Sequence, residues 1–176
     1  VEYPVRFGIK KQLLINDQYG LIQRNIQNIG ISAEDKQEID AHQLLNNAFA
    51  TDTWSDGQYL CDTDHPVGGS THSNRGTSAL SESSVSATRI LMMRLPDDKG
   101  LPKGIMADEL WVPPELEDTA TKITKSLLNP ETANNAMNPQ AGRFTVHVLP
   151  RLSDTNNWFM ASSVWRRQVV NWYERE

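Results

Sequence analysis

Apolar and polar positions along the chain change their spacing several times, and each spacing predicts a different kind of element. At the start, the apolar residues at positions 3, 5, 7 and 9 alternate with Pro4, Arg6 and Gly8. A period of two is typical of a half-buried β-strand. Pro4 favours the edge of a sheet, because proline cannot donate a ladder hydrogen bond. We therefore expect the chain to open with an edge strand.

Residues 17–50 change to helical spacing, with Asn16 or Asp17 as the cap. A break at Gly30 would give two helices, but one glycine costs only about 1 kcal/mol, so we favour a single helix. At the standard rise it would extend about 50 Å and serve as a spine. The residues expected to be mostly buried are Ile22, Ile26, Ile29, Leu44 and Leu45.

Residues 51–77 are rich in Asp, Ser, Thr and Gly, and turn signals recur at Asp56-Gly57, His65-Pro66 and Gly68-Gly69. We predict a long loop without secondary structure. Its few apolar anchors return about 1.5–3 kcal/mol each when buried, against about 1–2 kcal/mol of backbone entropy per ordered residue. We therefore expect the loop to become ordered only against the protein body or neighbouring subunits.

The second half of the chain alternates short helices and strands. Ser81 is positioned to cap a helix that Pro96 ends, with Leu80 and Val85 as its hydrophobic staple. Strands are predicted at 109–112, 144–148 and 158–161, and a polar loop at 129–142. A helix at 115–128 places on one face Leu116, Ala120, Ile123, Leu127 and Leu128. The fold class that follows is α+β.

Composition limits the class of protein. The 176 residues carry 17 Lys+Arg and 22 Asp+Glu, a net charge of −5. A protein built to coat nucleic acid would show a clustered basic excess, so this balance argues against a dedicated nucleic-acid-binding protein. A single cysteine and the lack of any membrane-length apolar run predict a soluble protein made in a cytoplasm, without membrane contact. Because the sequence begins at Val1, we expect a piece of a longer protein.

One cluster has residue types suited to metal binding, namely Cys61, Asp62, Asp64, His65 and His72. Zinc or iron ligands are drawn from such residues, so a metal-dependent enzyme is the hypothesis from a different class. Their spacing matches no known ligand pattern, and a polar surface loop explains them equally well. We predict no metal and no cofactor.

Nucleophilic catalysis is weakly supported. Ser70, Ser73 and Ser81 are candidates, yet no nucleophile-elbow motif surrounds them, and Ser81 is already assigned to a helix cap. His147 falls inside an apolar strand, which favours a packed histidine over a base. No phosphate-binding glycine loop is present, because Gly68-Gly69 lacks a following Lys-Ser/Thr pair. We predict no catalytic residues and no enzyme activity.

Arginine and tryptophan gather near the end of the chain. Arg166 and Arg167 lie beside Trp165 and Trp172, which would allow base stacking and phosphate contact. Four residues are few for that purpose. Tryptophan and arginine are also the residues that dominate protein–protein contacts, and an interface is the favoured interpretation.

Six stretches, in the same order and spacing, resemble the phage Mu-type major head subunit family. They are HPVGGSTHSN, ALSE, DDKGLPKGI, LWVPPELEDTA, KSLLNPETANNAMNP and VLPRLSDTNNWFMA. The resemblance covers residues 15–161. It implies a Hong Kong 97-type capsid fold, with a spine helix, a peripheral domain and an axial domain. Some proteins of that fold cross-link their subunits through Lys and Asn, and no such link is assigned to this chain.

The resemblance also implies an organisation and a function. Residues 1–16 would be the end of an extended loop, 17–79 part of the peripheral domain, 80–163 the axial domain, and 164–176 a truncated return segment. The protein would be a tailed-phage major capsid protein, self-assembling as hexamers and pentamers into an icosahedral shell around phage DNA. A scaffolding protein or a protease would be a further partner. Contacts between subunits are expected at 51–77, at 129–142 and at the terminal Trp/Arg cluster.

The expected location is the virion, with assembly in the cytoplasm of a bacterial host. An alternative within the same fold is the shell of a bacterial nanocompartment that encloses cargo enzymes. Electron microscopy separates these hypotheses. Large closed shells would favour the capsid protein, small cargo-filled shells the nanocompartment, and discrete monomers the metal-dependent enzyme.

Overall fold

The computed structural model describes residues 8, 11, 20–128 and 136–169. The chain divides into two compact units, Val1–Leu44 and Leu45–Glu176. The predicted opening strand and the caps Asn16 and Asp17 lie outside the described residues, as does Trp172.

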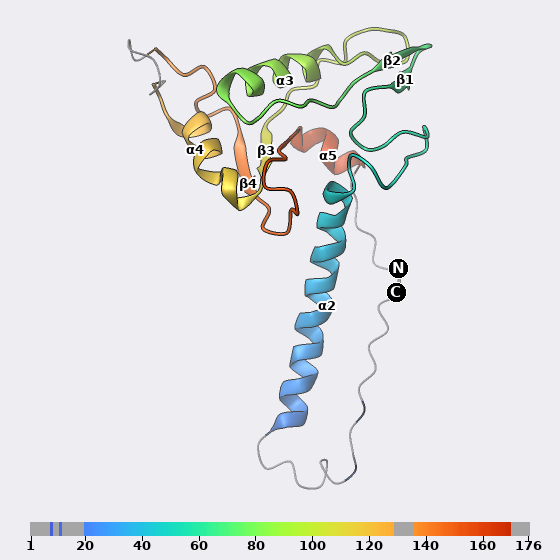
Figure 1. Cartoon of the computed structure of the whole chain (residues 1–176), viewed down its shortest axis with the longest axis vertical. Coiled ribbons are helices and arrows are strands. Elements are labelled where there is room, and N and C mark those ends of the chain that lie inside the picture. The colour runs from blue at the N-terminus through green and yellow to red at the C-terminus, as the bar shows by residue number, and fades with distance from the viewer. Residues whose placement is uncertain (1–7, 9–10, 12–19, 129–135, 170–176) are drawn as a thin grey trace. The chain divides into compact units, whose positions relative to one another are not determined.

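The predicted long helix is present as α2, Leu21–Asn46, which continues through Gly30 without a break (Figure 1). The burial expected along it is only partly confirmed. Leu45 is buried and Ile29 and Leu44 are half-buried, whereas Ile26 is 55% exposed. Ile31, which is also exposed, follows Ile26 by five positions and therefore points about 140° away around the helix. Apolar side chains on opposite sides of one helix cannot all face the same core.

The helix predicted after Ser81 is confirmed as α3, Glu82–Arg94. The Ser81 hydroxyl accepts a hydrogen bond from the Ser84 amide, and the Ser84 hydroxyl accepts one from the Ser81 amide, forming a capping box. Leu80 and Val85 on either side of the cap are both buried. The helix ends at Arg94, and Leu95 is its C-cap, directly before the proline at position 96 that was predicted to end it.

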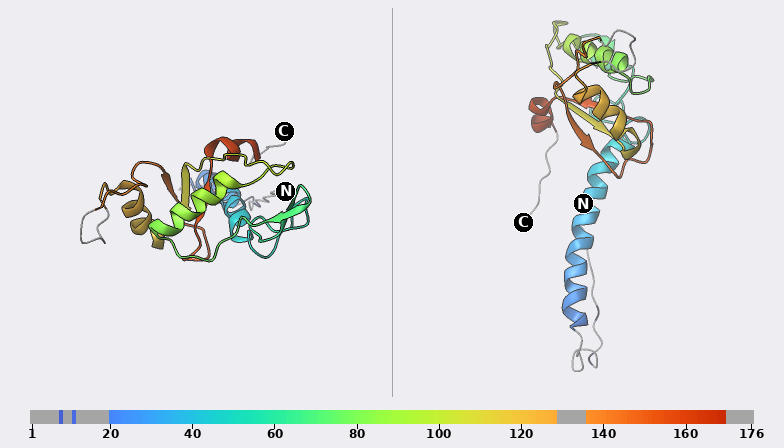
Figure 2. Two further views of the ribbon diagram at one scale, coloured as in Figure 1. Left: turned by 90° about the horizontal axis from the view of Figure 1, so that it is seen from above. Right: turned by 90° about the vertical axis from the view of Figure 1, so that its left-hand side faces the viewer.

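Three predicted strands form one mixed sheet in the order β4-β3-β5. The central strand β3, Glu109–Val112, is parallel to β4, Thr145–Val148, and antiparallel to β5, Phe159–Ala161. Leu110 and Val112 are fully buried. A parallel pair needs a crossover connection, and α4, Glu117–Lys125, supplies it and packs along β4 (Figures 1 and 2).

The core of the second unit lies between this sheet and the helices α3 and α4. Its buried members are Leu80, Val85, Leu110, Val112, Ala120, Ile123 and Phe144. Helices and strands thus contribute to one core, which confirms the predicted mixture of helix and sheet.

The helix predicted at 115–128 is shorter than expected. A 3-10 turn, Pro114–Leu116, leads into α4, which ends at Lys125. Leu127 and Leu128 therefore lie beyond the helix and are exposed, contrary to the prediction. The reason is a returning turn that occupies the last helical carbonyls: the Asn138 amide group donates to the carbonyls of Ile123 and Ser126, each at 2.8 Å.

Residues 51–77 are not a loop without secondary structure, so that prediction is wrong. They contain a hairpin of β1, His65–Val67, and β2, Ser70–His72. The predicted turn at Gly68-Gly69 joins the strands, and both glycines have positive φ, as a two-residue type I′ turn requires. A Cβ at Gly68 would lie 2.5 Å from the Asp98 carbonyl oxygen, so glycine is also needed for space.

Candidate functional site

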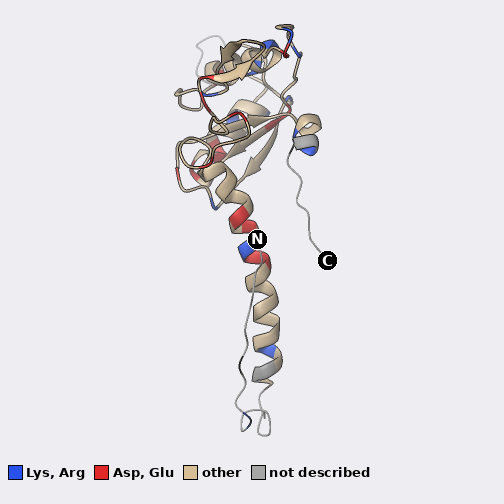
Figure 3. Ribbon diagram, turned by 90° about the vertical axis from the view of Figure 1, so that its right-hand side faces the viewer, with Lys and Arg blue, Asp and Glu red and all other residues tan. Residues whose placement is uncertain are grey.

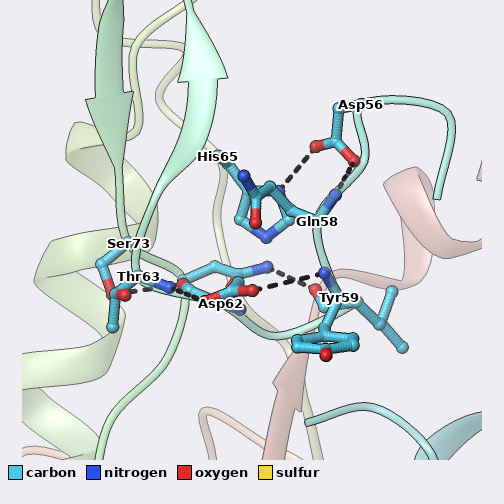
Figure 4. Close-up of polar contacts among 9 residues, drawn as sticks. Asp56, Gln58, Tyr59, Asp62, Thr63, His65 and Ser73 are labelled. Atoms are coloured by element: carbon cyan, nitrogen blue, oxygen red, sulfur yellow. Dashed lines mark hydrogen bonds and ion pairs between the residues drawn. The ribbon is translucent and has the colours of Figure 1, made fainter. Parts of the chain in front are cut away.

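Polar hydrogen bonds hold the segment that leads into the hairpin (Figure 4). Asn74 joins two parts of it, because its amide oxygen accepts from the Asp62 amide and its NH2 group donates to the Leu60 carbonyl, both at 2.8 Å. The Asp62 carboxylate accepts from the amides of Thr63 and Tyr59, at 2.7 and 3.4 Å. The bond from Thr63 is the main cause of the lowered pKa of Asp62. These bonds order a segment that buries little apolar surface.

Asp56 and His65 form a carboxylate–imidazole pair next to this network. The Asp56 carboxylate lies 2.8 Å from Nδ1 of His65, and its second oxygen accepts from the Gln58 amide at 3.1 Å (Figure 4). The hydrogen bond to His65 is the main reason that the pKa of Asp56 is lowered. His65 therefore has a structural partner that sequence reasoning did not identify.

The five residues considered for metal binding do not form a common site in the described structure. Asp62 is engaged by backbone amides, and His65 by Asp56. Burial raises the pKa of the Cys61 thiol to about 11, which opposes the thiolate form that binds metal. His72 lies directly opposite His65 in the hairpin, and Asp64 is exposed. Across residues 20–128 and 136–169, no three His, Cys, Asp or Glu side chains converge on a possible metal position.

None of the candidate nucleophiles hydrogen-bonds to a histidine among the described residues. Ser81 is the helix cap, Ser70 is an exposed residue of β2, and the Ser73 hydroxyl donates to the Arg75 carbonyl at 3.0 Å. His147 is not a packed histidine as predicted, because its side chain is 44% exposed. Its strand alternates exposed and half-buried residues, and position 147 falls on the exposed face.

Arg166 makes an ion pair inside the chain, which the sequence did not predict. It lies on α5, Ser163–Val169, and donates two hydrogen bonds to Glu109, at 2.8 and 2.9 Å. The bonds from Arg166 are the main cause of the lowered pKa of Glu109. Arg166 is thus held by β3, whereas Trp165 stays 41% exposed beside Lys103. The sequence did contain one signal of this pair: Glu109 begins the otherwise apolar strand β3, and a carboxylate in such a place needs a positively charged partner.

Many large apolar side chains lie on the surface of the second unit. Leu101, at 62% exposed, is typical. The exposed set is Trp54, Ile90, Leu91, Met93, Leu101, Met106, Leu127, Leu128, Met137, Val164 and Trp165. In the described part of the predicted contact loop 129–142, Met137 is exposed, whereas Asn138 and Gln140 are buried and Asn138 bonds to the end of α4.

Charge is unevenly spread over the same unit (Figure 3). Residues 51–64 contain Asp52, Asp56, Asp62 and Asp64 and no Lys or Arg. Within the parts of the chain that the structure describes, no helix is both long and apolar enough to cross a membrane. The exposed apolar side chains are therefore the main candidate sites, as surfaces for contact with other proteins.

Comparison with known proteins identifies the family. No curated protein matches the sequence. Among solved structures, the capsid of bacteriophage JBD30 decorated with minor capsid protein trimers has a similar fold, with a TM-score of 0.65 and 17% sequence identity. The match covers 82% of this chain and 72% of that chain. The sequence pattern of the family described as phage capsid protein matches residues 5–176, and the chain therefore belongs to that family.

Proposed function

We propose that this capsid protein self-assembles as hexamers and pentamers into an icosahedral shell that encloses phage DNA. Its location would be the virion, after assembly in the host cytoplasm, with a scaffolding protein or a protease as a further partner. The proposed fold is the Hong Kong 97 type, with residues 17–79 in a peripheral domain and 80–163 in an axial domain. Residues 1–16 would be the end of an extended loop, and residues 164–176 would form a return segment that includes most of α5.

The exposed apolar surface is the observation that carries this proposal. Among the described residues of the second unit, more large apolar side chains are exposed than are buried in the core cluster. The helix α3 illustrates the point, because Val85 is buried near its start while Ile90, Leu91 and Met93 near its end are exposed. Large exposed apolar patches mark surfaces that bind other proteins. A shell subunit, which has neighbours on several sides, accounts for exposed residues on several elements.

Charge and chemistry support a structural role. The net charge of −5 suits a shell that contacts DNA without sequence specificity better than a dedicated DNA-binding protein. The half-buried Cys61 thiol, with its raised pKa, and the hydrogen-bonded Asp62 and His65 are poorly suited to metal catalysis. The protein would act through repeated modest contacts that a closed shell multiplies.

Electron microscopy of the purified protein tests the proposal. We expect large closed shells with five-fold and six-fold positions. Small shells filled with protein would favour a nanocompartment instead. A protein that remains monomeric at all concentrations, in the presence of its scaffolding partner as well, would contradict the proposal.

A further inference from the structure

A small cleft of about 190 Å3 opens beside α3 in the second unit. Its lining residues are Arg89, Met93, Met106, Ala107, Asp108 and Arg143. The two methionines give it an apolar wall, and Met106 is 66% exposed. Methionine adapts its shape to a partner, which makes such walls common at binding surfaces.

The arginines of this cleft have no carboxylate partner among the described residues. Nε of Arg89 is buried without a hydrogen bond, and its Nη1 contacts only the Met93 sulfur, at 3.7 Å. Nε of Arg143 donates to the Pro139 carbonyl, which is neutral. The Asp108 carboxylate also lines the cleft but already accepts hydrogen bonds from the amide and hydroxyl of Ser163. The cleft therefore suits a group that is both apolar and negatively charged.

One segment of the same chain has that chemistry. Trp54 is 39% exposed, and Asp52 and Asp56 lie on either side of it in the sequence. The Trp54 amide donates to the Gln58 carbonyl at 2.8 Å, and the Gly57 amide donates to the Trp54 carbonyl at 2.9 Å. These bonds fix residues 53–59 as a tight turn, so little further ordering is needed on binding. We call residues 52–59 the Trp54 turn.

We propose that the cleft of one copy binds the Trp54 turn of a neighbouring copy, an inference that rests on the proposed shell function. Tryptophan and arginine are the residues that most often dominate protein interfaces. Asp52 accepts one hydrogen bond, from the Asn47 amide group at 2.7 Å on Oδ2, so its other oxygen would pair with Arg143. Asp56 is already engaged by His65 and the Gln58 amide and would add only negative charge beside the tryptophan. No residue of the turn lines the cleft in the same copy. In the rings of the proposed shell this contact would run head-to-tail from copy to copy, and such contacts close when the rotation between copies permits. A reciprocal two-fold contact would instead give only covalent dimers in the test below.

Disulfide cross-linking in assembled particles tests the pairing. The variant Ser55→Cys/Met106→Cys places one thiol on the turn and one in the cleft wall. We expect oxidation to give a ladder of covalent multimers, because each head-to-tail contact links a new copy. The single variants should give no ladder, and neither should Ser55→Cys/Glu115→Cys, whose second thiol is exposed away from the cleft. Intact particles that give no ladder overturn the inference.

Charge reversal gives a second test that does not depend on added cysteines. Arg143→Glu places a carboxylate in the cleft and should raise the concentration needed for assembly by about tenfold, through like-charge repulsion. Adding Asp52→Lys should restore most of that loss, since the pair is then reversed and not removed. Failure of Asp52→Lys to restore assembly would count against the pairing. If the unaltered protein forms no particles, the proposed function itself fails, and this inference fails with it.

Discussion

Residues 51–77 and the strand β3 with its neighbours are ordered by different means. The first region is fixed by hydrogen bonds, centred on Asn74 and Asp62, with half-buried apolar residues such as Leu60 around them. The second is fixed by burial, because Leu110 and Val112 are completely enclosed. Polar side chains can therefore order a segment that cannot build a core.

The difference has an energetic consequence. Burial of a large apolar side chain contributes about 1.5–3 kcal/mol, whereas one hydrogen bond contributes a net of about 0.5–1.5 kcal/mol, since water competes for the same groups. A polar network also opens locally without exposing the core. We expect changes in β3 to affect the whole unit and changes in residues 51–77 to act locally.

The largest effect is expected from Leu110→Ala. The substitution removes a fully buried side chain and leaves a cavity, which lowers the free energy of unfolding by about 2–5 kcal/mol. Chemical denaturation measures it. Leu101→Ala is the matched control, because Leu101 is exposed and should change stability by less than about 0.5 kcal/mol. Equal losses in the two variants would contradict the assigned core.

A smaller loss is expected from Arg166→Ala, which removes two hydrogen bonds from the buried Glu109 carboxylate and leaves it the longer contact to His147, at 3.8 Å. Because Arg166 is itself about one-third exposed, we expect a loss of about 2–3 kcal/mol, below the range for fully buried pairs. Arg167→Ala removes an exposed arginine next in sequence and serves as the control.

The same pair predicts a pH dependence. The pKa of Glu109 is lowered in the folded state, so its stabilising contribution is present above the unfolded value of about 4.3 and is lost as pH falls through the folded value. Arg166→Ala should therefore lose less stability than the unaltered protein between about pH 5 and pH 3. An unchanged acid profile would argue against the pair.

Much of the second unit could be predicted from sequence because its signals are local. Ser81 and Pro96 mark the ends of α3, and the apolar residues at 110–112 mark β3. The end of α4 could not be predicted, because Asn138, thirteen residues beyond its last residue, caps it. The Glu109–Arg166 pair, 57 positions apart, was missed for the same reason.

Ser81→Ala should lower the free energy of unfolding by about 1 kcal/mol, less than Arg166→Ala. The reason is that it removes the hydroxyl that accepts a hydrogen bond from the Ser84 amide. Thermal or chemical unfolding measures the change. Ser86→Ala, in the middle of α3, is the control and should be neutral or slightly stabilising, since alanine has the higher helix propensity. A loss in Ser86→Ala equal to that in Ser81→Ala would contradict a capping role.

Asn74→Ala tests the polar region directly. It removes the side chain that joins Leu60 to Asp62, so hydrogen exchange of the amides at 59–63 should become faster. The global free energy of unfolding should change by less than about 0.5 kcal/mol, because the segment opens without the core. Asn156→Ala is the control, since its side chain is exposed and lies outside this network. A large global loss would mean that the two regions unfold together.

The smallest effect is expected at the Asp56–His65 pair, where both groups remain partly exposed to solvent. The hydrogen bond from His65 lowers the pKa of Asp56 below its unfolded value of about 3.9. The local stabilisation is therefore present above that value and is lost as pH falls through the lower, folded pKa. The Gln58 amide, which donates to Asp56, reports it. Its protection against hydrogen exchange, corrected for the intrinsic rate, should fall as the pH is lowered from about 5 to about 3. In Asp56→Asn, which does not titrate, the fall should disappear, so the same decline in both proteins would show that another group controls the turn.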